Sequence, residues 1–361
     1  MSEPASVTPA ASSPPAPAQT ERGWTKFLLA LAALVFLPMI PQVRAMLPIE
    51  QTMLLFVPAV AACALVGWWA GGRAFLAIAW VAIAVLIVAT PAAQTDAFYN
   101  LARGWGLLLA GSFGLVCLVA TGGSLLRRAS MALCITLALA AAMSVVGRIR
   151  VAEASRTISA EYARRNGETL KALNAVIDEH PKEWRDIVTK LPPLAELPAE
   201  TEKDLAALSA AARAVFPALL ALESLAVLAL AWATYHRLGR ARLGLPLRPL
   251  REFRFNDQLV WGLIVGLTIM LVPTLSSLRG LGQNLLVFFG FLYAMRGFGV
   301  LTWFVAPGSL AITLVVGLVM LLAPVLQVFA VLAFMLIGVG ALALGLGDTW
   351  ADWRNRVRPT L

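Results

Sequence analysis

The feature that most constrains this chain is a succession of apolar runs of about 17–22 residues, separated by short polar segments. A helix rises about 1.5 Å per residue, so each run is long enough to cross about 30 Å of hydrocarbon. The composition agrees, because 60% of the residues are hydrophobic and 14% are charged, whereas soluble domains carry about 25% charged residues. The sequence therefore predicts an all-α, polytopic integral membrane bundle. It excludes a disordered, collagen-like or disulfide-stapled chain.

We expect about ten transmembrane helices. The predicted spans are residues 24–43, 52–70, 74–91, 104–122, 129–148, 214–235, 258–276, 283–305, 308–323 and 325–346. The last two are separated only near Pro324, and a re-entrant hairpin over 308–346 is the alternative. The predicted organisation is a disordered tail (1–20), helices one to five (21–148), a stalk (149–213) and helices six to ten (214–361).

The distribution of basic residues predicts the orientation of these spans. With the N-terminus inside, the cytoplasmic segments hold 14 basic residues, against three (Arg44, Arg103 and Arg279) in the short outer loops. This asymmetry follows the positive-inside rule and requires an even number of spans. We therefore expect a bacterial inner (cytoplasmic) membrane protein with both termini in the cytoplasm and residues 149–213 outside.

The long polar segment between the fifth and sixth spans is expected to form a helical hairpin. Residues 151–179 are rich in Ala, Glu, Arg and Leu, with a possible interruption at Asn166 and Gly167. A second helix start is predicted at Pro181, because proline is favoured at the first helical position. Pro192, Pro193 and Pro198 predict a loop before a helix over 200–213. A stalk of this kind either binds a partner or is a solvated spacer.

Two ionisable side chains fall deep inside predicted spans, where charge is costly and is usually paired or functional. Glu223 lies about 13 Å below the outer surface in the sixth span, and Arg296 lies about 20 Å below it in the eighth. The two are a candidate intramembrane charged pair. The alternative is a snorkelling Arg296 and a protonated Glu223.

The eighth span also carries a face of small and polar residues that predicts either close helix packing or a cavity lining. Its members are Asn284, Gly290, Tyr293 and Gly297. Other side chains are candidates for contact with lipid headgroups or for plain topological anchoring. They are Arg240, Arg242, Arg248, Arg251, Arg254, Trp350 and Trp353.

Nothing in the sequence points to catalysis. The chain lacks HExxH, GxSxG, Walker A and CxxC motifs, and its three cysteines fall in apolar runs. The net charge of +9 comes from arginines between spans, so it indicates topology and not nucleic-acid binding. We therefore expect a non-enzymatic protein with no catalytic residues, no metal and no cofactor.

The last 100 or so residues resemble the YybS-like family of uncharacterised bacterial membrane proteins. The resemblance rests on the basic segment before Phe255, on Asn284 with the motif at 290–300, and on the motif at 345–354. It implies a multi-span inner-membrane protein without an assigned activity. The family is loosely similar to the substrate-binding subunits of energy-coupling-factor vitamin transporters.

Two functions remain open from the sequence. The first is a scaffold or assembly subunit of a larger membrane complex, which contacts the lipid bilayer and binds a protein partner through the stalk or helix faces. The second is a small-solute transporter or a substrate-binding subunit of one. Five spans on each side of the stalk would permit an inverted repeat.

Overall fold

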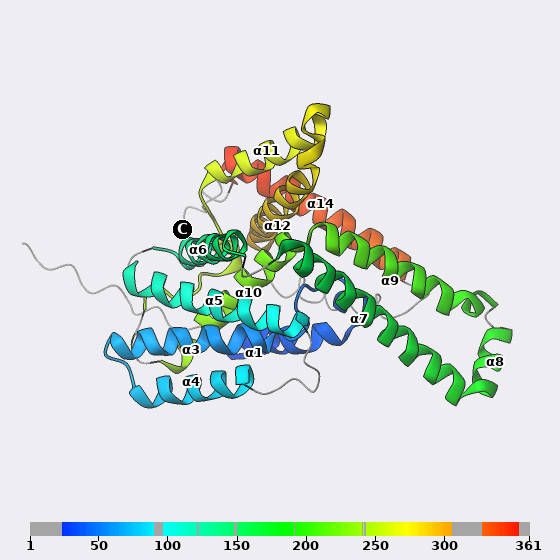
Figure 1. Ribbon diagram of the computed structural model, residues 1–361. Helices are drawn as coiled ribbons and strands as arrows, with labels where there is room; N and C mark the ends of the chain where they lie inside the picture. The colour runs from blue at the N-terminus through cyan, green and yellow to red at the C-terminus, as the bar shows by residue number, and fades with distance from the viewer. Residues whose placement is uncertain are drawn as a thin grey trace, which may run out of the picture.

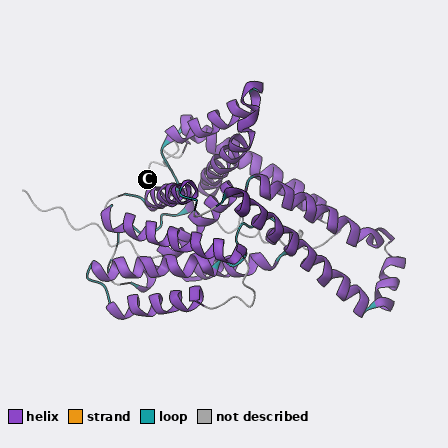
Figure 2. Ribbon diagram, in the orientation of Figure 1, coloured by secondary structure: helices purple, strands orange, loops and turns teal. Residues whose placement is uncertain are grey.

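A computed structural model of the protein describes residues 24–89, 97–120, 123–147, 150–190, 192–239, 241, 243–304 and 327–353. Pro193 and residues 327–334 are described by their backbone only. This part of the chain consists of helices and loops, without strands (Figure 2). The predicted all-α class is therefore confirmed. The predicted tail, residues 1–20, lies outside the described residues.

The helices follow one another along the chain as in Figure 1. The α-helices are α1 (Trp24–Phe36), α2 (Pro41–Arg44), α3 (Met53–Trp69), α4 (Ala74–Ala89), α5 (Ala97–Val119), α6 (Leu125–Val145), α7 (Val151–Glu179), α8 (Pro181–Lys190), α9 (Leu197–Ala214), α10 (Phe216–Leu238), α11 (Val260–Leu271), α12 (Arg279–Phe304) and α14 (Gln327–Ala351). The short 3-10 helices are η1 (Leu37–Met39), η2 (Pro192–Glu196), η3 (Leu250–Glu252), η4 (Asp257–Leu259) and η5 (Pro273–Leu278).

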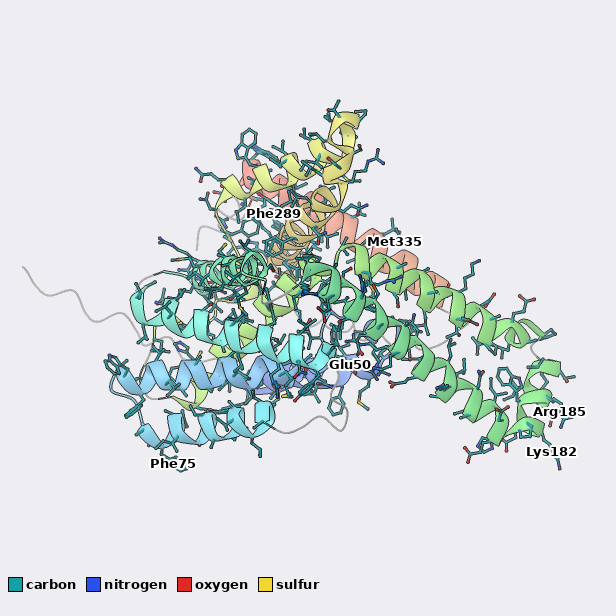
Figure 3. The ribbon with its side chains drawn as sticks, in the orientation of Figure 1. Glu50, Phe75, Lys182, Arg185, Phe289 and Met335 are labelled. Atoms are coloured by element: carbon teal, nitrogen blue, oxygen red, sulfur yellow. The ribbon has the colours of Figure 1, made fainter. Side chains whose placement is uncertain are left out.

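The bundle is centred on α3, which packs against α4, α5 and α10. Most residues of α3 are buried, as expected for a helix that is apolar on all sides. Its neighbour α4 is equally apolar but leaves Phe75, Ile78 and Leu86 exposed, and Figure 3 shows Phe75 on the outer side of the bundle. Such a face is suited to contact with lipid.

A second group of helices, α11, α12 and α14, packs through glycines. A Cβ atom on Gly297 would lie 1.7 Å from the Ala341 carbonyl oxygen, and one on Gly345 would lie 1.9 Å from the Tyr293 carbonyl oxygen. The backbones of α12 and α14 therefore touch, as small residues permit in membrane helix pairs. On α11, a Cβ atom on Gly262 would collide with the Phe289 ring of α12.

The stalk projects from the bundle as an arm made of α7, α8 and α9 (Figure 1). The predicted helices at 151–179 and from Pro181 are present. The expectation that this helix could be interrupted at Asn166 and Gly167 is wrong, because α7 is continuous through both residues. Lys182 and Arg185 lie at the far end of the arm (Figure 3).

Four helical segments of the described chain are long and apolar enough to cross a membrane, namely residues 97–119, 125–145, 216–238 and 273–304. Shorter apolar helical segments cover residues 24–39, 53–69, 74–89, 257–271 and 335–351. These nine segments fall on nine of the ten predicted spans. The remaining span, 308–323, lies outside the described residues, and the count of ten stays a prediction.

Two predicted spans are not continuous helices. The span predicted over 24–43 breaks after α1, where Pro38 and Pro41 interrupt the chain and Ile40 is extended. The span predicted over 258–276 breaks at Val272, which is extended before Pro273. Proline removes a backbone donor and disfavours helical geometry in the preceding residue, which explains both breaks.

Candidate functional site at the base of the stalk

The stalk is anchored where α7 crosses the loop of residues 45–52 that joins α2 to α3. Arg165 of α7 is 1% exposed and donates hydrogen bonds to the carbonyl oxygens of Leu47 (2.8 Å) and Pro48 (3.3 Å). The Tyr162 hydroxyl donates to the same Leu47 carbonyl at 3.3 Å. The loop carbonyls have no helical partner of their own, so α7 satisfies them.

Charged side chains surround this anchor and form what we call the stalk-base cluster. Its members are Arg44, Glu50, Glu161, Arg164, Arg165 and Glu168. Within α7, Nε of Arg165 lies 2.7 Å from Glu161 Oε1. Across the interface, Nη2 of Arg44 lies 2.8 Å from Glu168 Oε2. Figure 3 places Glu50 where the arm meets the bundle. The three arginines balance the three glutamates.

The arginines of the cluster lower the pKa of Glu161 and Glu168. Burial opposes ionisation of Glu161, but hydrogen bonds from Arg164 and Arg165 outweigh it and lower the Glu161 pKa. Hydrogen bonds from Arg44 and Arg164 lower the pKa of Glu168. Burial raises the pKa of Tyr162 to about 12. At neutral pH the carboxylates of Glu161 and Glu168 are therefore ionised, and Tyr162 keeps its proton for the bond to Leu47.

Glu223 of α10 holds the same loop from the side of the bundle. Its Oε2 accepts a hydrogen bond from the Ile49 backbone N–H at 3.1 Å. Its Oε1 is buried and has no hydrogen-bond partner among the described residues. The loop is thus fixed by Arg165 from the stalk and by Glu223 from the bundle.

The predicted pair between Glu223 and Arg296 is wrong. Arg296 donates from Nε to Asp348 Oδ2 (2.9 Å) and from Nη2 to the Asp348 carbonyl oxygen (3.1 Å). It also contacts Asp257, and its guanidinium lies 5.5 Å from the centre of the Phe255 ring. The helix predicted to end at residue 346 continues to Ala351 in α14, which brings Asp348 beside α12. We call Arg296, Asp257 and Asp348 the Arg296 cluster.

Residues of the small and polar face of α12 show both predicted roles, close helix packing and cavity lining. Gly297 and Tyr293 pack against α14. Asn284 instead bridges to the junction of α9 and α10, accepting from the Ala218 N–H at 2.8 Å and donating to the Ala214 carbonyl at 3.2 Å. Gly290 lines a cavity. Packing and cavity lining therefore both occur, at different residues.

The predicted headgroup contacts differ in their surroundings. Arg248, Arg251, Arg254 and Trp350 are exposed, and Arg254 also bonds Asp352 at 2.7 Å. Trp353 is half-buried, and its ring packs against Gly347, 2.8 Å from where a Cβ atom on that glycine would be. The predictions for Arg240 and Arg242 fall outside the described residues. Contact of any of them with lipid headgroups stays a prediction.

One further arginine, which the sequence marks only as a basic residue between two predicted spans, is buried in the structure. Arg128 is 1% exposed, donates to the Leu243 carbonyl and lies 5.1 Å from the centre of the Trp232 ring. It therefore fixes the start of the segment between α10 and α11 against α6.

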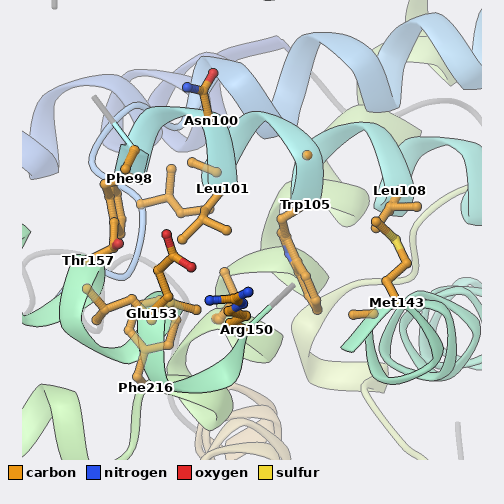
Figure 4. Close-up of a pocket in the computed structure, with 18 residues that line it drawn as sticks. Phe98, Asn100, Leu101, Trp105, Leu108, Met143, Arg150, Glu153, Thr157 and Phe216 are labelled. Carbon is orange, nitrogen blue, oxygen red and sulfur yellow. The ribbon is translucent and has the colours of Figure 1, made fainter. Parts of the chain in front are cut away.

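Two cavities flank the loop at the stalk base. The first, the Glu223 cavity, measures about 780 Å³ and lies between α1, α10, α12 and α14. The second measures about 560 Å³ and lies between α5 and the starts of α7 and α10. Figure 4 shows Phe98 and Trp105 of α5 facing Arg150 and Glu153 beside this second cavity. Ile49 lines the second cavity, while Leu47 and Pro48 line the first.

A family model described as "Predicted membrane protein (DUF2232)" matches residues 30–340. The chain belongs to the DUF2232 family. Together with the long apolar helices, this membership makes the chain an integral, multi-pass membrane protein that associates with the lipid bilayer. The match to DUF2232 corrects the extent of the expected family resemblance, because it covers nearly the whole chain and not the last 100 residues alone. No curated protein and no solved structure matches this DUF2232 member.

The stalk-base cluster of this DUF2232 member was missed by sequence reasoning. In the sequence, Arg44 and Glu50 are isolated charges between two apolar runs, and Glu161, Arg164 and Glu168 resemble an ordinary solvated helix face. A usable signal was the spacing of Glu161 from Arg164 and Arg165, which places them on one helix face at three and four residues. The partner of that face depends on where the arm crosses the bundle, which no local pattern specifies.

Proposed function

We propose that this protein is a non-enzymatic scaffold or assembly subunit of a larger complex in a bacterial inner membrane. In this proposal it has about ten spans, both termini lie in the cytoplasm, and the stalk presents a binding surface for a protein partner outside. The contrast between the two ends of the stalk carries the proposal. Its base is fixed to the bundle by buried bonds, while its far end exposes charged side chains.

The rigid base matters because an arm that holds a partner must keep a defined direction. Arg165 and Tyr162 of the stalk bond the backbone of the loop at residues 45–52, and Glu223 of α10 bonds the same loop from the side of the bundle. Bonds to backbone atoms cannot be released by a change of side-chain rotamer in the loop. The direction of the stalk is therefore fixed relative to the bundle.

Orientation is tested with reporter fusions. Fusions after Arg128, Gly244 and Arg358 are expected to report a cytoplasmic location, and one near Glu196 an extracytoplasmic one. A cytoplasmic signal at Glu196 would overturn the proposed topology, because it reverses the parity of the neighbouring spans.

Partner binding is tested by co-purification from native membranes with mass spectrometry. The double charge reversal Lys182→Glu with Arg185→Glu at the stalk tip is expected to reduce recovery of a stoichiometric partner. The matched control is Arg251→Glu, an exposed arginine in the segment between α10 and α11. A wild-type protein that purifies as a monomer without a partner would contradict the scaffold proposal.

The Glu223 cavity favours a second function, that of a small-solute transporter or its substrate-binding subunit. A cavity inside a predicted membrane region that contains one acidic side chain is typical of solute sites. Uptake into vesicles containing the purified protein tests this alternative, with Gly290→Leu as the variant that fills the cavity.

A further inference from the structure

The cavity between α5 and the starts of α7 and α10, which we call the Trp105 cavity, combines apolar walls with two side chains of opposite charge. Leu101, Trp105 and Leu108 of α5 and Met143 of α6 supply much of the apolar wall. The indole N–H of Trp105 already donates to Ser224 Oγ at 3.0 Å. The Trp105 ring therefore has no free polar atom and serves as apolar surface.

The two charged side chains of the lining, Arg150 and Glu153, lie three residues apart at the start of α7. Both are exposed, and neither has an ion pair or a side-chain hydrogen bond in the described part of the chain. Figure 4 shows both beside the cavity, across from Trp105. Further along the same helix, Glu161 and Arg164 pair with each other. Arg150 and Glu153 are therefore accessible from the cavity and available to a ligand.

The cavity lies where the apolar bundle gives way to the polar stalk. Helix α6, which ends at Val145, is long and apolar enough to cross a membrane, whereas α7, which begins at Val151, carries charges along its length. Lipid headgroups meet their hydrocarbon chains at such a boundary. The lining follows α5 from Phe98 to Leu108, a length of about 15 Å. This is the depth of one leaflet, since the hydrocarbon of both leaflets together is about 30 Å thick.

We propose that the Trp105 cavity binds a phospholipid of the phosphatidylethanolamine class, with its phosphate at Arg150, its ammonium group at Glu153 and one acyl chain along Trp105 and Leu108. Arginine binds phosphate oxygens, and a carboxylate accepts charge-assisted hydrogen bonds from a primary ammonium group. A choline head has no N–H to donate, and a glycerol head has no positive charge to offset Glu153. The second acyl chain remains in the bilayer.

The size of the cavity suits a ligand of this kind. Its volume of about 560 Å³ is within the range of pockets that hold small organic ligands, about 300–1,000 Å³. Lipid binding here depends neither on the scaffold role nor on transport. A protein that binds the lipid but no partner would contradict the scaffold proposal alone.

The test uses three phospholipid probes with the same photoreactive acyl chain and different heads: ethanolamine, choline and glycerol. The protein is reconstituted in phosphatidylcholine vesicles with a trace of one probe and irradiated, and the labelled residues are mapped by mass spectrometry. In the wild type we expect labelling at Leu101, Leu108 and Met143, with the ethanolamine probe favoured over each of the others by about fivefold. That factor corresponds to about 1 kcal/mol, the upper range for an ion pair near solvent.

Substitutions of the two charges decide which group each one binds. Glu153→Gln removes the charge that attracts the ammonium group, so the preference for ethanolamine over choline should be lost. Glu179→Gln, at an exposed residue at the far end of α7, should keep the preference. Arg150→Gln should reduce labelling by all three probes, because all three carry the phosphate. Arg156→Gln, at an exposed arginine of the same helix that does not line the cavity, should leave labelling unchanged.

A glycine in the lining allows the cavity to be filled without changing its charges. A Cβ atom on Gly104 would meet no other atom within 4 Å, so Gly104→Leu should occupy ligand volume and remove labelling by all three probes. Gly111 of the same helix is the matched control, since its added Cβ atom also meets nothing within 4 Å and it lines a different apolar pocket. Gly111→Leu should leave labelling unchanged.

Several results would overturn the proposal. Equal labelling by the three probes would show a groove for acyl chains without headgroup recognition. Strongest labelling by the glycerol probe would show an anion site at Arg150 alone. Absence of labelling at Leu101, Leu108 and Met143, or an ethanolamine preference that survives in Glu153→Gln, would also contradict it.

Discussion

The stalk-base cluster and the Arg296 cluster both use arginine to join segments that are distant in the sequence, but they distribute the bonds differently. At the stalk base, six side chains share the contacts, and several remain partly exposed, such as Glu168 with 46% of its side chain accessible. In the Arg296 cluster, Arg296 and Asp348 are 4% and 0% accessible and bond each other, and Arg296 also contacts Asp257. Loss of one member should therefore cost most where the charges are most deeply buried.

The largest effect is expected for Arg296→Leu. Removing one partner of a buried ion pair typically costs about 3–5 kcal/mol, because the other charge is stranded. Asp348 would lose both its bond from Nε and the bond to its carbonyl oxygen. The thermal unfolding midpoint of the detergent-solubilised protein should fall strongly.

The double variant Arg296→Leu with Asp348→Leu sharpens this prediction. Replacing both buried charges with apolar groups is often nearly neutral, so much of the lost stability should return. Arg251→Leu, at an arginine whose side chain is 60% accessible, is the control and should change little. Strictly additive losses in the double variant would show that the two residues do not stabilise each other.

The next largest effect is expected for Arg165→Leu in the stalk base. The substitution leaves the Pro48 carbonyl without a donor and the Leu47 carbonyl with the Tyr162 hydroxyl alone, and an unsatisfied buried group costs about 1–3 kcal/mol. Hydrogen exchange followed by mass spectrometry should show faster exchange in the loop at residues 45–52. Lys171→Leu, at an exposed residue of the same helix, should leave the loop protected.

A smaller loss of thermal stability is expected when the pH is lowered. The pKa of Glu161 is lowered in the folded protein, so ionised Glu161 stabilises the fold above its unfolded pKa of about 4.3. This contribution is lost as the pH falls through the folded-state value. At pH 7 the wild type should therefore be more thermally stable than Glu161→Gln.

Measuring both proteins over a series of pH values distinguishes loss of the Glu161 charge from a packing defect. The difference in unfolding temperature between wild type and Glu161→Gln should shrink as the pH is lowered below about 4.3. A difference that stays constant over the whole range would show that Glu161 stabilises the stalk without its charge.

The smallest effect is expected for Arg44→Ala at the rim of the stalk-base cluster. Ion pairs near solvent contribute about 0–1 kcal/mol, and Arg164 remains to bond Glu50 and Glu168. The unfolding temperature should change little. A loss as large as that of Arg165→Leu would break the comparison, because it would show that the shared cluster depends on single members.

The sequence by itself determined the membrane class, the positions of most helices and the helical stalk. Apolar runs of membrane-spanning length and the alanine-rich, charged segment at 151–179 are local signals, and they correspond to α3, α4, α10 and α7. The proline breaks at Pro41 and Pro273 are local as well, because proline acts on its own helix. These features follow from neighbours within a few residues.

Only the tertiary structure decided which charges meet. Estimated depth predicts a pair of Arg296 with Glu223, yet Arg296 bonds Asp257 and Asp348, the latter 52 residues along the chain. Arg165 reaches Leu47 across 118 residues. Depth along a membrane normal leaves the rotation and neighbours of each helix open. Those are set by where α12 and α14 touch through Gly297 and Gly345, and by where the arm crosses the loop, which no local pattern encodes.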